Sequence, residues 1–309
     1  MNERPVIVVV GNCQARPLAR AFSALSPTGA DIARIAVVHL LTDSDEAQYA
    51  PYFAAADWIL AQSVADSYPC QFIRTATLQS RYGGKVLRWP NLFYHGYNPE
   101  LTYLRGSDRR PLSGPLGDYH NATVLEGWLR GMTASEALQM HLDEEYNRLA
   151  YAEVPERSLC ELQRREEATD VQVTPWIRQR RWQQRLFFTF NHPAHALIME
   201  SARQLALAAG LEPVEATPNG GPVRETLGAY RPPMNPWVRR SQGCTLEEPG
   251  HYTGVEVLAV NNGLVVVGKK CSYEPLEFVE ACFRIYDGNR KLLTARARPA
   301  RASSGVVGS

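Results

Sequence analysis

The sequence predicts an α/β fold with an open, mainly parallel sheet and helices on both of its faces. Through the first half of the chain, short apolar runs alternate with segments in which apolar residues recur at helical spacing. Parallel strands need helical crossovers, so this alternation is typical of a doubly wound sheet. A helix-rich middle region predicts a helical insertion, and an Asn-Gly turn between two late apolar runs predicts a C-terminal β-hairpin.

Each predicted strand is a short apolar run that ends at a polar or turn-forming residue. The runs are residues 5–10, 35–41, 58–61, 85–89 and 185–190, followed by the hairpin strands 255–260 and 264–267. The predicted helices are residues 15–22, 43–56 with an interruption near Pro51, 71–80, 124–132, 135–149, 156–167, one that begins with Thr174 as N-cap and Pro175 at N1, 194–209 and 276–285.

The run at 185–190 is expected to return to the first sheet, which makes residues 107–183 an insertion between two of its strands. We therefore expect one α/β domain over residues 1–295, a length that can bury a sizeable core. Residues 296–309 are rich in Arg, Ala, Ser and Gly and predict a disordered tail.

The charge balance gives no reason to expect nucleic acid or a membrane as a partner. The chain has 33 Lys and Arg against 32 Asp and Glu, and its apolar runs are shorter than a membrane span. The N-terminus leads directly into a strand and lacks the pattern of a signal peptide. These features predict a cytoplasmic protein and leave its oligomeric state open.

The cysteines are scattered, which argues against a disulfide framework and against a zinc site. The six lie at positions 13, 70, 160, 244, 271 and 282, without a CxxC pair or a metal-like spacing to the histidines. No metal cofactor is expected, and the cysteines other than Cys13 are most simply packing residues.

Cys13 follows directly after the first strand, in the turn Gly11-Asn12-Cys13-Gln14 that precedes a helix. At a helix N-terminus the macrodipole and unpaired N–H groups favour a thiolate, and the same N–H groups can hold an oxyanion or a phosphate. Cys13 can also be a buried packing residue, as single cysteines often are.

Other strands end in residues that can carry chemistry, and parallel strands bring such residues to one edge of the sheet. The residues on this predicted edge are Asn12, Cys13, Gln62, Asn91, Asn191 and His192. The set contains a nucleophile, a base and neutral donors for a developing oxyanion, which acyl transfer requires. His192 can alternatively cap a helix, and His95 and His120 are rival bases. Asp118 can orient an imidazole or cap the helix that begins near Asn121.

The chain resembles the WcbI-type family of capsular polysaccharide biosynthesis acetyltransferases over residues 5–290. The resemblance rests on Gly11-Asn12-Cys13-Gln14, Ala56-Asp57 leading to Gln62 and Tyr68, Pro90-Asn91 with Gly96-Tyr97, Gly117-Asp118-Tyr119, and Phe188-Thr189-Phe190-Asn191-His192-Pro193. The opening also resembles, more loosely, the SGNH hydrolases, although Cys13 stands where their serine is expected. Both resemblances fit an SGNH- or flavodoxin-like core.

The WcbI resemblance implies transfer of acetyl from acetyl-CoA to a sugar hydroxyl during capsule synthesis. On that interpretation Cys13 and His192 are catalytic, and a glycan or small molecule is the acceptor. Positioning and oxyanion roles are assigned to Asn12, Gln14, Asn91 and Asn191, coenzyme A binding to Gln14, Arg16 and Gln62, and substrate binding to Tyr97, Asp118 and His120. Lys269 and Lys270 are weaker candidates for the phosphates. The alternatives are an SGNH-like esterase or thioesterase, and a sugar- or nucleotide-binding protein without catalytic activity.

Overall fold

The structure is a computed structural model that describes residues 4–106, 110–215, 225–247, 249–261 and 264–297 of the 309-residue chain. The chain divides into two compact units, Met1–Tyr94 with Glu156–Gly228 (unit 1) and His95–Pro155 with Ala229–Ser309 (unit 2). This division differs from the single predicted domain over 1–295, because it cuts the predicted insertion at residue 156 and places its second part in unit 1.

Unit 1 contains the predicted parallel sheet. Its strands are β1 (Val6–Gly11), β2 (Asp31–Val37), β3 (Trp58–Gln62) and β4 (Val86–Trp89), in the order β2-β1-β3-β4. Its helices are α1 (Ala15–Leu25), α2 (Glu46–Ala55), α3 (Thr75–Tyr82), α7 (Val154–Glu166), α8 (Thr174–Arg180) and α9 (His195–Ala208), with 3-10 turns at Val38–Leu40, Asp43–Asp45 and Gly83–Lys85.

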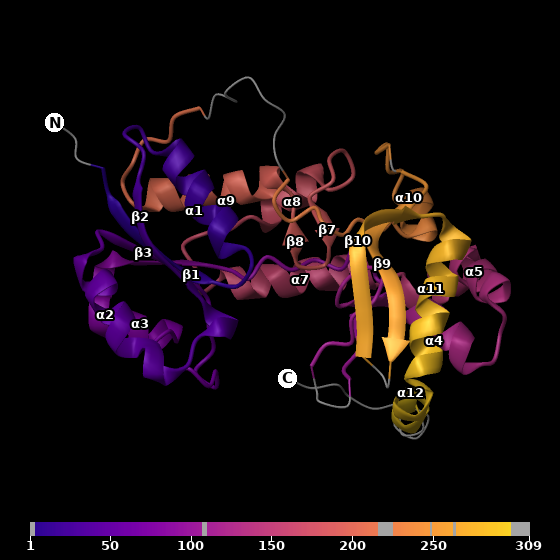
Figure 1. Cartoon of the computed structure of the whole chain (residues 1–309). Helices are drawn as coiled ribbons and strands as arrows, with labels where there is room; N and C mark the ends of the chain where they lie inside the picture. The colour runs from indigo at the N-terminus through magenta and orange to yellow at the C-terminus, as the bar shows by residue number, and fades with distance from the viewer. Residues whose placement is uncertain (1–3, 107–109, 216–224, 248, 262–263, 298–309) are drawn as a thin grey trace. The chain divides into compact units, whose positions relative to one another are not determined.

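Helices cover both faces of this sheet, as the sequence predicted. Helices α1 and α9 pack on each other over one face, and α2 and α3 lie on the other (Figure 1). The chain moves outward from β1 to β2 and then crosses to β3 on the far side of β1. In open sheets this reversal opens a crevice at the carboxyl ends of the two central strands, here β1 and β3.

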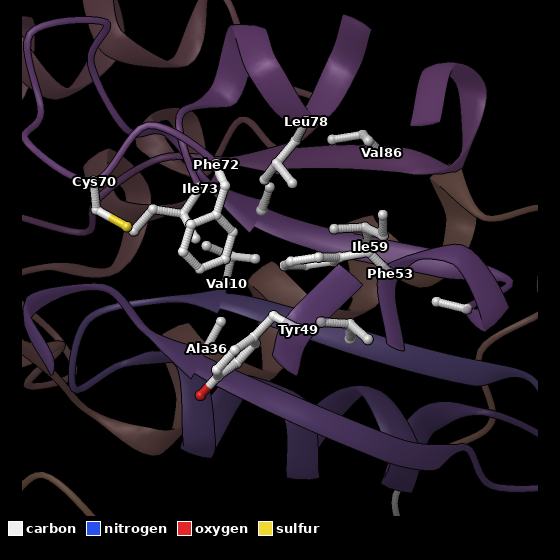
Figure 2. Packing of buried hydrophobic residues seen from close by; sticks show 13 residues of the cluster. Val10, Ala36, Tyr49, Phe53, Ile59, Cys70, Phe72, Ile73, Leu78 and Val86 are labelled. Atoms are coloured by element: carbon white, nitrogen blue, oxygen red, sulfur yellow. The ribbon is translucent and has the colours of Figure 1, made fainter. Parts of the chain in front are cut away.

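A hydrophobic cluster fills the space between the sheet and helices α2 and α3 (Figure 2). Val10, Ile59 and Val86 extend from three adjacent strands towards Phe53 of α2 and Leu78 of α3. Ile59, Leu78 and Val10 are completely buried. Close packing on both faces holds the strand ends rigidly, which fixes the position of the turns that follow them.

Strand β2 differs from the predicted run 35–41. It begins at Asp31, ends at Val37 and is followed by the 3-10 turn Val38–Leu40. It forms an edge of the sheet, and a register shift opposite Ile7 and Val8 leaves Ala33 as an extra residue. An edge strand needs no continuous apolar run, because one of its sides faces solvent. The apolar run at residues 35–41 therefore gave the wrong bounds for β2.

The predicted strand 185–190 does not join the parallel sheet. Residues Phe187–Thr189 (β7) instead pair antiparallel with His192–Pro193 (β8), in a separate two-stranded sheet. The chain reverses at Phe190 and Asn191, so the apolar run turns back on itself after three residues. The expectation that residues 185–190 return to the first sheet is therefore wrong.

Helix α8 begins differently from the prediction. Thr174 is its first residue rather than its N-cap, and Pro175 comes second. The buried carboxylate of Glu166 accepts the N–H of Val173 at 2.9 Å and the N–H of Thr174 at 3.0 Å. The Glu166 side chain, at the end of α7, therefore accepts hydrogen bonds from backbone N–H groups that have no partner within α8. Burial raises the pKa of Glu166, and these hydrogen bonds oppose the shift.

Unit 2 contains the predicted hairpin and two of the four predicted middle helices, 124–132 and 135–149. Its strands are β5 (Leu101–Tyr103), β6 (Tyr119–Asn121), β9 (Tyr252–Asn261) and β10 (Leu264–Tyr273). Its helices are α4 (Ala122–Leu129), α5 (Ala134–Leu142), α6 (Glu144–Tyr151), α10 (Pro236–Ser241), α11 (Pro275–Gly288) and α12 (Arg290–Ala297). Helix α11 packs against α4, α5 and the β9–β10 hairpin (Figure 1).

The hairpin is longer than predicted, and its predicted turn at 262–263 lies outside the described residues. The single predicted helix 135–149 is two helices, because Asp143 ends α5 and its side chain accepts the N–H of Tyr146 at the start of α6. Residues 296 and 297 end α12, and the rest of the predicted disordered tail, 298–309, is not described.

Candidate functional site

The candidate site begins where β1 ends. Residues 7–10 are completely buried, and the strand finishes at Gly11. A Cβ on Gly11 would lie 3.0 Å from the Trp89 ring and 3.2 Å from the Gln62 side chain. Only glycine lets these two neighbours approach so closely, so this residue allows β1 to reach the polar cluster described below.

Asn12 shapes the turn between β1 and α1. Its backbone carbonyl accepts the N–H of Ala15 at 3.0 Å, and its side-chain Oδ1 accepts the N–H of Gln14 at 3.0 Å. These bonds satisfy donors at the start of α1, as an Asx turn does. Cys13 therefore occupies a fixed turn directly before α1, and it is exposed.

Side-chain amides join the carboxyl ends of the strands, as predicted for this edge. Gln62, the last residue of β3, accepts the N–H of Asn12 at 2.9 Å. Asn91, which follows β4, accepts a hydrogen bond from Nδ2 of Asn12 at 3.2 Å. Asn12 thus bonds to the residues that end two other strands, and the structure brings all three together.

Gln14 connects this edge to the β7–β8 hairpin. Its Nε2 donates to the carbonyl of Leu92 and to the carbonyl of Asn191, both at 2.8 Å, and its Oε1 accepts Nε2 of Gln62 at 3.0 Å. Gln14 is completely buried. Because Asn191 directly precedes His192, this bond brings the hairpin that carries the imidazole beside the turn that carries the thiol.

These bonds also bear on the coenzyme A contacts predicted for Gln14 and Gln62. Both amide hydrogens of Gln14 are used by backbone carbonyls, and the Gln62 side chain is buried. A direct contact with a cofactor would require this network to open. The geometry therefore favours positioning roles for both residues.

The Cys13 thiol is neutral in its surroundings. Partial burial of the sulfur raises its pKa, and the backbone N–H of Cys13 opposes the shift. The expectation that the start of α1 lowers this pKa is wrong in direction, since desolvation outweighs the local hydrogen bond.

His192 is also neutral at pH 7. It lies half-buried in β8, and burial lowers its pKa to about 4. A neutral imidazole can accept a proton, whereas an imidazolium cannot. Both shifts favour the neutral forms of the two side chains, a thiol and an imidazole.

Arg165 of α7 lies beside this edge, and the sequence analysis missed it. Its Nη1 donates to the carbonyl of Asn91 at 3.3 Å, and its guanidinium lies 5.6 Å from the centre of the Phe93 ring. Phe93 in turn contacts Phe190 of the hairpin turn, with ring centres 4.9 Å apart. The sequence shows the apolar spacing of α7, but it does not show that the Arg165 side chain extends towards Asn91.

The residues predicted to bind substrate lie in unit 2. Tyr97 is buried and Asp118 is exposed, with its pKa raised by partial desolvation. His120 is completely buried, its Nε2 lies 2.8 Å from the carbonyl of Leu112, and burial lowers its pKa to about 4. Burial makes His120 a packing residue and argues against its substrate role.

Asp118 does not cap the following helix, because the side chain of Asn121 accepts the N–H of Val124 at the start of α4. The preceding turn bears a different constraint. Gly117 has a φ of +64°, and a Cβ there would lie 2.6 Å from the Tyr230 ring. The Gly-Asp-Tyr motif therefore begins with a residue that its turn and its neighbour both require to be glycine.

Arg16 is exposed in the first turn of α1, and Lys269 and Lys270 are exposed on β10. Among the described residues, no group of three or more His, Cys, Asp or Glu side chains could hold a metal ion. Within the same part of the chain, every helix is too short or too polar to span a bilayer.

The fold is that of an α/β protein with a parallel sheet, and in open sheets of this class ligands bind outside the carboxyl ends of the strands. The fold is similar to that of a solved structure described as WcbI, a polysaccharide biosynthesis enzyme, with a TM-score of 0.68 and 21% identity over 97% of this chain and 98% of that chain. That structure is described as native protein without a disulfide bond between coenzyme A and one of its cysteines. No curated protein sequence matches the chain.

The chain belongs to the family of the polysaccharide biosynthesis enzyme WcbI, whose model matches residues 6–214. The family resemblance found in the sequence is thereby confirmed. We call the carboxyl edge of the sheet, with Asn12, Cys13, Gln62, Asn91, Asn191 and His192, the thiol–imidazole edge. The matched range contains all of these residues, including the hairpin that carries His192.

Proposed function

We propose that this protein is a coenzyme A-dependent O-acetyltransferase that moves acetyl from acetyl-CoA to a sugar hydroxyl in capsular polysaccharide biosynthesis. The observation that carries the proposal is the hydrogen bond from Gln14 to the carbonyl of Asn191. It joins the Cys13 turn to the segment that carries His192. Membership of a polysaccharide biosynthesis family supports a glycan acceptor, and the coenzyme A named for the similar solved structure supports the acyl donor.

In a covalent route, Sγ of Cys13 attacks the thioester carbonyl of acetyl-CoA while its proton passes to His192. The bond from the acetyl carbon to the coenzyme A sulfur breaks, and that sulfur takes the proton from His192. The acceptor hydroxyl then attacks acetyl-Cys13, its proton passes to His192, and the Cys13 sulfur leaves and is reprotonated. The neutral states of both groups suit these proton transfers.

In a direct route, His192 takes the proton of the acceptor hydroxyl as the hydroxyl oxygen attacks the thioester carbonyl of acetyl-CoA. The bond from the acetyl carbon to the coenzyme A sulfur then breaks, and that sulfur takes the proton from His192. The Cys13 N–H and the side chain of Asn12 would then stabilise the oxyanion. Asn12 is held for this purpose by Gln62 and Asn91. Both routes use the same residues, and they differ in whether an acetyl group is found on Cys13.

The test is brief exposure of the protein to acetyl-CoA, followed by mass spectrometry of the peptide that contains Cys13. The covalent route predicts an acetyl adduct in wild type and in the Cys160→Ala control, and none in Cys13→Ala. Cys160 is exposed on α7 and serves as a matched thiol. If wild type consumes acetyl-CoA with an acceptor but never carries the adduct, the direct route is correct.

Binding of coenzyme A and acetyl-CoA is measured by the shift in melting temperature. A ligand at about 100 times its Kd stabilises the folded state by roughly 2.7 kcal/mol. Turnover of nitrophenyl acetate without coenzyme A, together with no shift from either ligand, would instead identify an esterase. Sugar or nucleotide binding that is unchanged in Cys13→Ala, together with no turnover of acetyl-CoA by wild type, would identify a binding protein without catalytic activity.

A further inference from the structure

We propose that a pocket along the outer edge of β2 binds the phosphate-bearing end of a substrate, through the guanidinium groups of Arg16 and Arg34. This extends the proposed function by assigning a place to the charged part of a nucleotide substrate. The pocket has a volume of about 410 Å³. The lining residues that matter below are Arg16, Arg34, Val37, Leu40 and Tyr49.

Both charged residues that line this pocket in the described part of the chain are basic. They are Arg16 and Arg34, and no acidic residue of that part lines it. Within the described ranges of the chain, neither arginine forms an ion pair. Nε of Arg34 is buried and has no hydrogen-bond partner there. Two guanidiniums with unused donors suit a phosphate, whose oxygens accept such bonds in pairs.

The rest of the pocket is apolar and aromatic. The Arg34 guanidinium lies 4.9 Å from the centre of the Tyr49 ring and 5.4 Å from that of Tyr52. Leu40 is 71% exposed and Tyr52 is 38% exposed, so apolar surface borders the charged groups without a covering side chain. A ligand that joins phosphate to a flat or apolar group fits this pairing better than inorganic phosphate does.

The extra residue in β2 gives Arg34 its direction. Ile32 pairs with Ile7, but Arg34 pairs with the next residue of β1, Val8. Paired residues of parallel strands point to the same face, and Val8 lies in the cluster with Tyr49 and Phe53. The bulge therefore turns Arg34 towards α2 at the outer edge of the sheet.

One end of the pocket lies beside the end of β1, which leads into the Cys13 turn. Val37, at its inner end, pairs in register with Gly11, which is two residues before Cys13. Arg16 follows Cys13 by three residues, so it lies about one helical turn further along the chain. Neighbouring strands are about 4.8 Å apart. A long ligand can thus hold its phosphates at Arg16 and Arg34 and extend a reactive group towards Cys13.

Two substrates carry this chemistry: coenzyme A, through its phosphorylated adenosine, and a nucleotide-linked sugar, through its diphosphate. The experiment measures the Kd of both by titration calorimetry, with coenzyme A, dephospho-coenzyme A, pantetheine and UDP-glucose as probes. The variants are Arg16→Gln and Arg34→Gln. Arg20→Gln is the matched control, because Arg20 is exposed on the same helix and does not line the pocket.

Loss of one charge-assisted contact is expected to weaken binding about tenfold or more in each variant, with no change in the control. A weaker Kd for coenzyme A alone identifies the acyl donor as the occupant, and a weaker Kd for UDP-glucose alone identifies the acceptor. Pantetheine lacks phosphate, and its binding should not change. Circular dichroism of the variants without ligand shows whether they are folded. If Arg34→Gln does not fold, Arg16→Gln alone tests the inference.

The inference is overturned if both variants bind coenzyme A and UDP-glucose as tightly as wild type does. Tight binding of coenzyme A in that case leaves the proposed acetyl transfer intact. If wild type binds UDP-glucose through Arg34 but does not bind coenzyme A, the pocket stands and the coenzyme A dependence fails. If wild type binds neither probe, both proposals are wrong.

Discussion

Replacement of Gln14 by alanine should release the β7–β8 hairpin from the carboxyl edge of the sheet. The buried side chain makes four hydrogen bonds, with Leu92 N, Leu92 O, Asn191 O and Gln62 Nε2. Each is worth about 1 kcal/mol net, and more where a buried partner stays unsatisfied. Their sum predicts a loss of about 4 kcal/mol in the free energy of unfolding. That is a large share of the roughly 5–15 kcal/mol that holds a domain together.

Urea denaturation followed by circular dichroism measures the loss, and hydrogen exchange of the peptide 187–193 reports on the hairpin itself. Gln163→Ala is the control, because Gln163 is exposed on α7. We expect faster exchange of the hairpin in Gln14→Ala and no change in the control. A loss below about 1 kcal/mol with unchanged exchange would show that the hairpin is held by other contacts and that the reasoning is wrong.

Three further predictions concern unit 2 and the start of α8. Gly117→Ala should lower the free energy of unfolding by about 2 kcal/mol more than Gly131→Ala does. Both glycines have a positive φ, but only at Gly117 would the added Cβ collide with the Tyr230 ring. Equal melting temperatures of the two variants would contradict this prediction. Burial lowers the pKa of His141 to about 4, so its contribution to stability is present above pH 6.5 and is lost as the pH falls towards 4. Urea titrations should show that His141→Asn removes about 2 kcal/mol of the stability difference between pH 7 and pH 5, and an unchanged difference would refute the assignment. Glu166→Ala should cost about 2 kcal/mol or more by leaving two N–H groups of α8 without an acceptor, which calorimetric melting measures; a smaller loss would show that water replaces the carboxylate.

The parallel sheet could be predicted because its central strands are nearly continuous apolar runs. Residues 7–10 and 59–61 are buried on both faces, and burial of that kind leaves a clear signal in the sequence. The edge strand β2 begins four residues earlier than predicted, because its first three residues are exposed and the charged Asp31 and Arg34 interrupt its apolar run. The division into units was not visible, since it depends on which distant segments pack together.

The residues of the thiol–imidazole edge could be named from the sequence because they follow strands directly. Asn12, Gln62 and Asn91 meet as expected. The strand predicted before His192 is a hairpin instead, yet its turn still reaches the edge through Gln14. Arg165 was missed because helical spacing shows which face is apolar and does not show where a long side chain points.

The extra residue at Ala33 also affects how the molecule avoids association with other copies. An edge strand offers a row of free backbone groups to any other strand, and long regular edges promote aggregation. In β2 the shift at Ala33 breaks the regular spacing of those groups, and Arg34 places a charge on the same stretch. These features disfavour pairing of β2 with a strand of another molecule.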